Sequence, residues 1–306
     1  MNLHHVIEAQ QFDVSTISRL IQTTQDMEKV VSGGGTSQFR GRIMATLFYE
    51  PSTRTRFSFE AAMHRLGGSV VSTENAAEFS SVAKGETLED TVRILNGYAD
   101  VLVIRHYEVG SAKRAASVSR IPVINAGDGA GQHPTQALLD LYTIHKEIGS
   151  IEGLRIAMVG DLAQGRTVRS LAYLLSKYQD VRIYFVAPPL LKMKEDILGH
   201  LREKGVWYTE ETDLDKVLSE VNVVYQTRIQ KERFGDRIAD YEQCRGVYLI
   251  TSESLRMMKA DAIVMHPLPR LDEIAKEVDS DPRAAYFRQA QNGLSVRMAL
   301  LTMVLG

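Results

Sequence analysis

The sequence predicts an α/β protein with two domains, each a mostly parallel sheet flanked by helices. Apolar runs rich in β-forming residues alternate with amphipathic helical stretches along the whole chain, which is typical of parallel α/β folds. The chain has 306 residues, which is too long for one ordinary core and corresponds to two domains of roughly 150 residues each. The sequence contains no internal repeat and no low-complexity tract that would favour another architecture.

The individual elements follow from hydrophobic periodicity and from start and stop signals. Strands are expected at 42–48, 69–73, 101–104, 121–124, 154–159, 181–186, 222–226 and 262–265. Helices are expected after Ser52 as far as Gly67, and at 86–97, 134–148 and 282–305. The alternation of these elements is what predicts the parallel sheets.

The boundary between the domains is expected near 149–153, after the helix of 134–148, which could bridge them. The first domain would then be 1–149 and the second 150–283. The C-terminal helix, 284–306, is strongly apolar on one side and must dock somewhere. We expect it to pack back on the first domain.

Charge and cysteine content exclude several classes of protein. The formal net charge is -2, which argues against a general nucleic-acid binder and against a polybasic membrane protein. The single cysteine, Cys244, rules out an internal disulfide framework and fits a reducing compartment. There is no apolar run of about 18 residues and no signal-peptide pattern, so we expect a cytoplasmic protein.

Cys244 and His4-His5 lack a ligand pattern, and we expect no metal and no cofactor.

The most informative stretch is Phe48 to Arg56 (FYEPSTRTR), at the end of an apolar strand. Ser52 is a natural N-cap, so the free N–H groups of residues 53–55 and the positive end of the helix would face one small anion. Thr53, Arg54 and Thr55 add hydroxyl groups and a guanidinium. Phosphate is the expected ligand, and the alternative is an ordinary capped helix with solvated arginines.

A second helix start, in 127–136, also has ligand-binding character. A glycine-rich loop leads to His133, and Pro134 favours the first helical position. His133 and Gln136 would lie one turn apart, where an imidazole could donate to a carbonyl oxygen and an amide could bind an NH2 group. A surface cap with a solvated histidine fits these residues equally well.

Two basic segments in the second half follow strands, which is where open parallel sheets bind ligands. The segment 160–167 (GDLAQGRT) could hold a dinucleotide, but its spacing is not GxGxxG, and Arg166 suits a carboxylate or phosphate better. The segment 227–233 (TRIQKER) supplies Arg228 and Gln230. Two arginines from different strand ends would suit a small dicarboxylate, and the alternative is a charged, solvated face.

The loop 266–270 (HPLPR) and Lys84 complete the set of candidates. The prolines fix an extended loop whose carbonyl groups could accept hydrogen bonds from a substrate NH2 group. A stiff connector is the alternative for this loop. Lys84 lies on a polar loop and, considered alone, would be solvated.

Together, these motifs resemble the aspartate carbamoyltransferase catalytic chains in order and spacing along nearly the whole sequence. The motifs are STRTR at 52–56, HPTQ at 133–136, GDLAQGRT at 160–167, TRIQKER at 227–233 and HPLPR at 266–270. The resemblance implies a carbamoyl-group transferase of de novo pyrimidine biosynthesis, which converts carbamoyl phosphate and L-aspartate into N-carbamoyl-L-aspartate and phosphate. It further implies a carbamoyl phosphate-binding first domain, an aspartate-binding second domain and an active site in the cleft between them.

Carried over residue by residue, the resemblance implies the contacts of each substrate. Carbamoyl phosphate would be held by Ser52, Thr53, Arg54, Thr55, Ser80, Lys84, Arg105, His133, Gln136, Pro267 and Leu268. Aspartate would be held by Lys84, Arg166, Arg228 and Gln230. In the family, the residues corresponding to Ser80 and Lys84 reach the site of a neighbouring chain, which implies a homotrimer with shared active sites.

The implied mechanism needs neither a covalent intermediate nor a metal. Attack by the neutral amine gives a tetrahedral oxyanion, which Thr55, Arg105 and His133 could stabilise. Arg54 and Lys84 could stabilise the departing phosphate, which also accepts the proton of the amine. These five residues are the expected catalytic groups.

Glu50 requires a different role, because a carboxylate in the anion site would repel the ligand. We expect it to pair with Arg166 or Arg233 across the domain cleft and to favour a closed form once both substrates are bound. The sequence leaves open whether regulatory chains or a dihydroorotase join the trimer. Neither a nucleic-acid nor a membrane partner is expected.

Three other functions compete with this interpretation. Ornithine carbamoyltransferases share the phosphate motif but have HCLP where this chain has HPLP at 266–269, and Arg166 and Arg228 suit an acidic partner. A non-catalytic trimeric scaffold would be expected to lack a site residue, and every matching position is intact. A nicotinamide dehydrogenase is disfavoured by the glycine spacing of 160–165.

Overall fold

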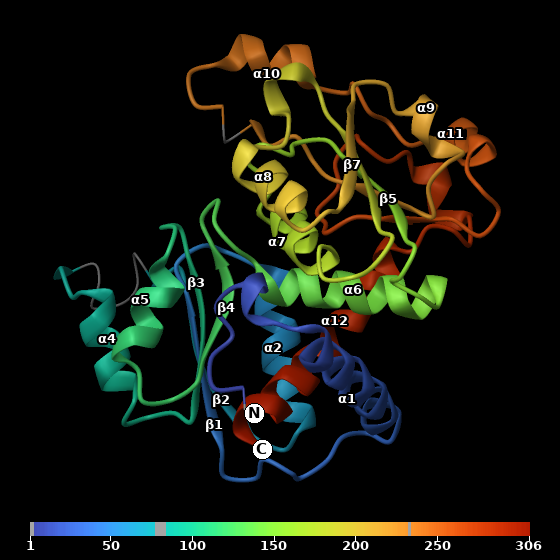
Figure 1. The fold of residues 1–306 in the computed structure, drawn as a ribbon. Coiled ribbons are helices and arrows are strands. Elements are labelled where there is room, and N and C mark those ends of the chain that lie inside the picture. The colour runs from blue at the N-terminus through green and yellow to red at the C-terminus, as the bar shows by residue number, and fades with distance from the viewer. Residues whose placement is uncertain (1–2, 77–83, 232–233) are drawn as a thin grey trace. The chain divides into compact units, whose positions relative to one another are not determined.

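The computed structural model describes residues 3–76, 84–231 and 234–306, and the chain forms two compact units. The first unit consists of Met1–Leu139 and Gln291–Gly306, and the second of Asp140–Ala290. The division falls within α6 (Pro134–Ile148) and within the long C-terminal helix α12 (Tyr286–Leu305), so each of these helices contributes to both units (Figure 1).

The first unit contains a parallel four-stranded sheet in the order β2-β1-β3-β4. Its strands are β1 (Ile43–Phe48), β2 (Ser69–Glu74), β3 (Val101–His106) and β4 (Val123–Asp128). Each overlaps a strand predicted from the sequence. All residues of the edge strand β2 are exposed or half-buried, whereas β3 and β4 are almost wholly buried.

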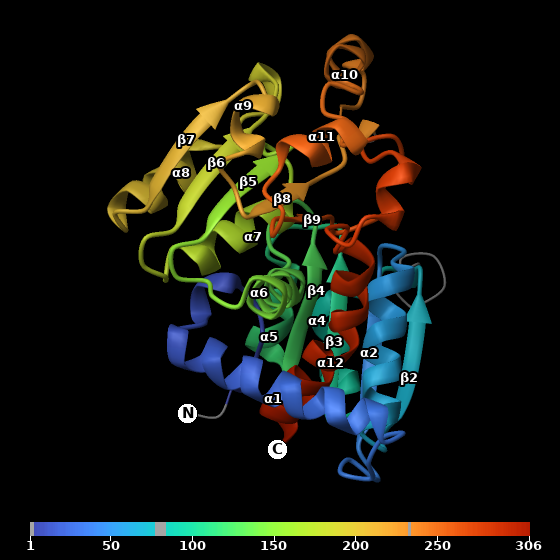
Figure 2. The ribbon, with the colours of Figure 1, turned by 90° about the vertical axis from the view of Figure 1, so that its right-hand side faces the viewer.

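Helices cover both faces of this sheet. The helices of the first unit are α1 (Val14–Ser32), α2 (Thr53–Arg65), α4 (Leu88–Leu95) and α5 (Ser111–Val118), with a short 3-10 turn, η1 (Ala9–Gln11). Figures 1 and 2 show α1 and α2 on one face and α4 and α5 on the other. The alternate residues Ala45 and Leu47 of β1, and Tyr49 directly after it, join the core formed with α4 and α5, as the two-residue period of a strand requires.

The second unit contains a parallel five-stranded sheet in the order β7-β6-β5-β8-β9. Its strands are β5 (Arg155–Val159), β6 (Arg182–Val186), β7 (Trp207–Glu211), β8 (Val223–Gln226) and β9 (Ile263–Met265). Sequence reasoning missed β7, because this edge strand is half-exposed and ends in two glutamates rather than forming an apolar run. The other four strands were predicted.

Helices also flank the second sheet. They are α7 (Arg166–Leu175), α8 (Glu195–Glu203), α9 (Asp215–Leu218), α10 (Ile238–Cys244) and α11 (Ser252–Met257), with 3-10 turns η3 (Pro189–Leu191) and η5 (Lys276–Ser280). Leu218 of α9 and Leu255 of α11 pack with Val159 and Val224 on one face of the sheet. Figure 1 shows α7 and α8 on the opposite side of the sheet. The prediction of two α/β domains with parallel sheets is thus confirmed.

Each sheet has one point at which the chain reverses its direction of winding. In the first unit the chain runs outward from β1 to β2 and then continues on the other side of β1, at β3; in the second, β5 and β8 are related in the same way. The carboxyl ends of the two strands at such a switch point form a crevice in which open α/β sheets bind ligands. Register pairs Phe48 with Arg105 at the first switch point and Val159 with Gln226 at the second.

Within the described ranges, no helix has the combination of length and apolarity that a bilayer span needs. The same ranges contain no group of three or more His, Cys, Asp or Glu side chains placed to hold a metal ion. Both findings concern only the part of the chain that the structure describes.

Candidate active site

The predicted anion motif lies at the first switch point. Ser52 occupies the N-cap of α2 with extended backbone, and the N–H of Arg56 donates to its carbonyl at 3.0 Å. The helix therefore starts where the sequence predicts. The Ser52 hydroxyl makes no capping hydrogen bond, contrary to the expectation for a serine cap. The N–H groups of the first turn have no intrahelical acceptor, so they can be donated to an anion instead.

The two arginines of this motif have different environments. Arg54 keeps part of its surface exposed, and the burial of the rest lowers its pKa, although a guanidinium stays charged at neutral pH. Arg56 instead lies 3.7 Å from Glu60 and 3.2 Å from Glu74 and is mostly buried. Arg56 therefore ties α2 to β2, while Arg54 remains the arginine suited to a ligand. The adjacent Thr55 is buried.

Arg105, at the end of β3, faces the same switch point. Its Nη1 donates to the Ala126 carbonyl at 3.2 Å, and its Nη2 lies 3.4 Å from a carboxylate oxygen of Glu50. This contact follows from the register, because Glu50 comes two residues after Phe48, the partner of Arg105. Glu50 thus contacts an arginine of its own unit. Its predicted pairing with Arg166 or Arg233 remains a prediction, and Arg233 lies outside the described residues.

His133 and Gln136 stand at the start of α6, as predicted. Both are buried, and the Gln136 N–H donates to the His133 carbonyl at 3.1 Å. The loop before them is organised by Asp128, whose two carboxylate oxygens accept from Gln132 N at 2.6 Å and from Gly110 N at 2.9 Å. Asp128 ends β4, next to β3, so it fixes the path of the chain from the sheet to His133.

In the second unit, a close backbone contact joins the two segments at the switch point. Thr227 donates from both its N–H and its hydroxyl to the Val159 carbonyl, each at 2.8 Å. Gly160 has φ +111°, and a Cβ at this position would overlap the Thr227 carbonyl oxygen. Only glycine satisfies both conditions. The 160–167 and 227–230 segments are thereby held side by side.

Arg166 and Arg228 therefore emerge from neighbouring strand ends. Arg166 is the first residue of α7 and is 9% exposed, while Arg228 and Gln230 are half-buried. Asp161 is buried and accepts from Gln164 N at 2.9 Å, which closes the turn that leads to α7. Two guanidiniums on a rigid crevice suit a small dicarboxylate, because each can form charge-assisted hydrogen bonds with one carboxylate.

The 266–270 loop follows β9, which pairs with β8. The His266 ring is buried and receives the Leu268 N–H at its Nδ1, at 2.7 Å. Its Nε2 lies 2.7 Å from Glu273. Leu268 has φ +51°, an uncommon backbone conformation for a bulky side chain. The loop is therefore held in a defined conformation by side-chain contacts. A loop that served only as a stiff connector would not need these contacts.

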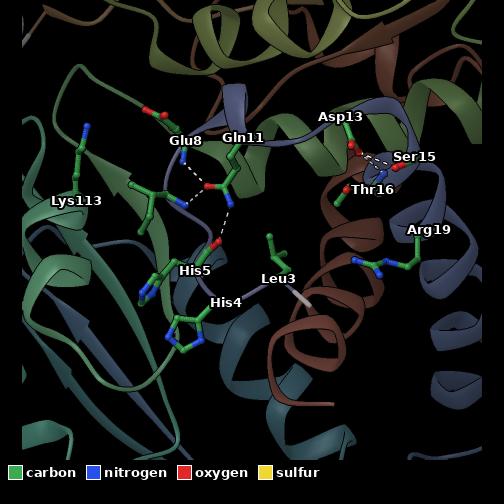
Figure 3. A pocket seen from close by; sticks show the side chains of 11 residues that line it. Leu3, His4, His5, Glu8, Gln11, Asp13, Ser15, Thr16, Arg19 and Lys113 are labelled. Atoms are coloured by element: carbon green, nitrogen blue, oxygen red, sulfur yellow. Dashed lines mark hydrogen bonds between the residues drawn. The ribbon is translucent and has the colours of Figure 1, made fainter. Parts of the chain in front are cut away.

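A further hollow, of about 650 Å³, lies in the first unit beside the N-terminal segment (Figure 3). Its lining includes His5, Gln11, Arg19 and Lys113, and none of the predicted site residues. Gln11 accepts from Ile7 N at 2.7 Å and donates to the His5 carbonyl at 2.6 Å. These contacts fold the N-terminal segment on itself. Because none of the predicted site residues lines this hollow, it is not the predicted active site.

Comparison with known families agrees with this geometry. Residues 4–146 match the model of the aspartate/ornithine carbamoyltransferase carbamoyl-P binding domain, and residues 152–304 match that of the Asp/Orn binding domain. The chain belongs to the aspartate/ornithine carbamoyltransferase family. The family resemblance inferred from the motifs is therefore confirmed.

Individual relatives are similar to this chain over almost its full length. Aspartate carbamoyltransferase 1, chloroplastic, from Pisum sativum is 60% identical over 304 residues, covering 99% of this chain and 79% of the relative. The aspartate carbamoyltransferase catalytic subunit of Thermoplasma acidophilum is 52% identical, covering 98% of each chain.

Solved structures show the same similarity. Aspartate transcarbamoylase from Trypanosoma cruzi, solved in complex with carbamoyl phosphate and aspartate, matches with a TM-score of 0.94 and 46% identity, covering 99% of this chain and 97% of that one. The catalytic subunit of M. jannaschii aspartate transcarbamoylase matches with a TM-score of 0.92 and 47% identity, covering 99% and 98%.

Two of the predicted site residues cannot be placed. Ser80 and Arg233 lie outside the described residues. Lys84 is described and exposed, just after the gap at 77–83. The other predicted residues are placed at, or beside, the ends of parallel strands.

Sequence reasoning missed the residues that support these carbamoyltransferase motifs. They are Asp128, Asp161, Thr227 and Glu273, whose contacts are given above, together with Asp140 and Gln289. A buried acidic residue next to a glycine-rich turn, as in GDG at 127–129 and GD at 160–161, was an available signal for the first two. Asp140 and Gln289 had none, because they bond to each other across 149 positions of the sequence.

Proposed function

We propose that this chain catalyses the transfer of the carbamoyl group of carbamoyl phosphate to the amino group of L-aspartate, giving N-carbamoyl-L-aspartate and phosphate. The observation that carries the proposal is the placement of an anion motif at one switch point and paired arginines at the other. Relatives that are 52% and 60% identical and bear the name aspartate carbamoyltransferase support it. The reaction is a step of de novo pyrimidine biosynthesis.

The phosphate group of carbamoyl phosphate is assigned to the first switch point. The N-terminus of α2, with Ser52, Thr53, Arg54 and Thr55, supplies N–H and hydroxyl donors and a positive charge. Arg105 adds a second guanidinium from β3. Donors of this kind bind the phosphate group of an acyl phosphate and favour its departure, because they interact more strongly as negative charge develops.

The carbamoyl group itself is assigned to His133, Gln136 and the 266–270 loop. His133 is placed to donate to the carbonyl oxygen, together with Thr55 and Arg105, as that oxygen becomes an oxyanion. Gln136 and the backbone at Pro267 and Leu268 offer acceptors for the NH2 group.

Aspartate is assigned to the second switch point. Arg166 and Arg228 carry the two positive charges that a dicarboxylate needs, and Gln230 adds an amide from the same segment. Ornithine would bring a cationic side chain to these arginines, which repel it. The substrate is therefore aspartate rather than ornithine.

The chemistry requires positioning and charge stabilisation rather than a covalent intermediate. The neutral amine of aspartate attacks the carbonyl carbon, a tetrahedral oxyanion forms, and the C–O bond to phosphate breaks as the amine proton passes to the phosphate. Arg54 and Lys84 stabilise the leaving group. Removing one donor to the oxyanion is expected to lower kcat on the order of 10²-fold or more.

Phosphate release tests this proposal. The purified chain is incubated with carbamoyl phosphate and either L-aspartate or L-ornithine. We expect rapid phosphate release with aspartate and only the background rate with ornithine. Background release with aspartate would overturn the assignment, and release with ornithine alone would move the chain to the other branch of its family.

We also propose a homotrimer with shared active sites. Several large apolar side chains of the first unit are exposed. They are Phe57 on α2, Val71 on β2, Ile94 on α4 and Tyr98, which follows α4 in the sequence. Exposed apolar side chains favour association, and the edge strand β2 leaves backbone groups on its outer side unpaired within the sheet. Light scattering should give three times the chain mass of 34.2 kDa. Mixing the inactive variants Arg54→Ala and Lys84→Ala after dissociation should restore part of the activity, which would not occur if each chain formed its own site.

The compartment and the further partners complete the proposal. We propose the cytoplasm, on the basis of the single cysteine, although the Pisum sativum relative is named chloroplastic. Fractionation of the source cells would decide, since organelle-bound activity would contradict it. Regulatory chains or a dihydroorotase would appear as added mass when the trimer is purified from its native extract.

A further inference from the structure

A chain of buried hydrogen bonds within the second unit leads from α6 to the 266–270 loop. The carboxylate of Asp140 accepts from the Tyr225 hydroxyl at 2.6 Å and from the Gln289 side-chain amide at 2.7 Å. The other end of the same amide, Gln289 Oε1, accepts from the backbone N–H of His266 at 2.8 Å. All four residues are at most 2% exposed.

The carboxylate of Asp140 determines which group is donor and which is acceptor in these hydrogen bonds. An ionised carboxylate only accepts hydrogen bonds, so the Gln289 NH2 group must face it and the Gln289 oxygen must face His266. Burial, and then the charge of Asp140, raise the pKa of Tyr225 well above its usual value, so that hydroxyl remains a donor. An asparagine at position 140 would also offer an NH2 group, and the orientation of the Gln289 amide would no longer be determined.

A second set of contacts fixes the His266 ring. Because Nδ1 accepts the Leu268 N–H at 2.7 Å, the ring proton is on Nε2, which donates to Glu273 at 2.7 Å. The other carboxylate oxygen of Glu273 accepts from Leu271 N at 3.1 Å. Burial alone would raise the pKa of Glu273, but the hydrogen bond from His266 lowers it below its ordinary value. The Nε2–H of His266 therefore faces a carboxylate that favours its ionised form.

These contacts determine where the Pro267 carbonyl points. In a planar trans peptide the N–H of one residue and the C=O of the preceding one point in opposite directions. The Leu268 N–H is directed at the His266 ring, so the Pro267 oxygen is directed away from it. The left-handed backbone of Leu268 persists only where the surroundings hold it, which is what the two sets of contacts do.

We infer that Asp140, Gln289, His266 and Glu273 are positioning residues that aim the Pro267 carbonyl at the NH2 group of carbamoyl phosphate. The inference rests on the proposed function and adds a basis for selectivity. A carbamoyl NH2 group donates to this carbonyl, whereas the methyl group of acetyl phosphate, which is otherwise similar in shape, cannot. The buried network therefore makes the site prefer a carbamoyl over an acetyl group.

The test is a comparison of two ligands by calorimetry on the full-length protein. Asp140→Asn and Glu273→Gln conserve shape but remove the directing carboxylates, and Tyr225→Phe removes one donor to Asp140. Asp272→Asn is the control, because Asp272 neighbours Glu273 but is exposed and reaches Arg245 only at 3.5 Å. We expect about tenfold weaker binding of carbamoyl phosphate to the first two variants, a smaller loss with Tyr225→Phe and unchanged binding of acetyl phosphate throughout.

Equal weakening of both phosphates would overturn the inference, because it would indicate a general disturbance of the site. Unchanged binding of carbamoyl phosphate would overturn it as well. If Asp140→Asn does not fold, Glu273→Gln and Tyr225→Phe decide by the same criterion. Failure of the proposed function is distinguishable, since the wild-type protein would then release no phosphate from carbamoyl phosphate and aspartate.

Discussion

The two switch points have the same topology but are built differently. At the first, the proposed ligand groups are the N–H groups of a helix start and side chains such as Arg54 and Arg105. At the second, the strand-end turns are held by backbone contacts and buried carboxylates, as the Gly160–Thr227 contact and Asp161 illustrate. The first site therefore relies mainly on charge and helix N–H groups, with Asp128 holding the loop before His133, and the second relies mainly on turns held by backbone contacts.

This difference fits the two ligands assigned to them. A phosphate is compact and highly charged, and a helix N-terminus already presents N–H groups to it. Aspartate has two carboxylates, so its arginines must be held at a fixed separation. Substitutions should consequently act on ligand binding at the first switch point and also on stability at the second.

The largest effect is expected from Arg54→Ala. Loss of this guanidinium removes charge stabilisation of the departing phosphate, so kcat should fall on the order of 10²- to 10³-fold. Arg56→Ala is the matched control, because Arg56 is bound to Glu60 and Glu74. Arg56→Ala should lower the urea midpoint of unfolding. Its loss of kcat should be much smaller than that of Arg54→Ala. Equal losses of kcat in steady-state assays would contradict the distinction between the two arginines.

Arg228→Ala should act on the other substrate. Removing one charged partner of a carboxylate is expected to raise the KM for aspartate by about 10- to 100-fold. The Kd for carbamoyl phosphate, measured by calorimetry, should stay the same. A parallel loss of carbamoyl phosphate affinity would show that the two switch points do not bind separate substrates.

Gly160→Ala should affect stability first. The added Cβ meets the Thr227 carbonyl and the backbone has φ +111°, so the free energy of unfolding should fall by about 2–3 kcal/mol. Gly153→Ala is the control, because Gly153 has φ +73° with no atom near its Cβ position. Its cost should be about 1 kcal/mol. Equal losses in urea titrations would mean that the contact with Thr227 is unimportant.

The smallest effect is expected from Glu50→Ala. If Glu50 pairs with Arg166 or Arg233 in the substrate-bound form, activity and aspartate affinity should fall about two- to fivefold. Carbamoyl phosphate binding should be largely kept. An unchanged aspartate saturation curve would remove this role and leave Glu50 as the partner of Arg105 seen here.

The candidate ligand residues carry local sequence signals and the supporting residues do not, for a physical reason. Ser52, Arg54 and Arg228 lie in short segments whose strand, turn and helix signals are local. The contacts of Asp140 with Tyr225 and Gln289 join residues separated by 85 and 149 positions. Only the fold brings these residues together.

Local signals also misjudged two features. A serine before a helix predicts a side-chain cap, but the Ser52 hydroxyl makes no such bond. Strand β7 was missed because an exposed edge strand shows no apolar run. Both features depend on surroundings that a window of sequence does not contain.

The most direct test of the division between the switch points is hydrogen exchange of the wild-type protein with saturating carbamoyl phosphate. We expect slower exchange of the amides of residues 53–55, with those of 165–167 and 227–230 slowed only when aspartate is added as well. Protection of the second set by carbamoyl phosphate alone, with no change at 53–55, would contradict the account.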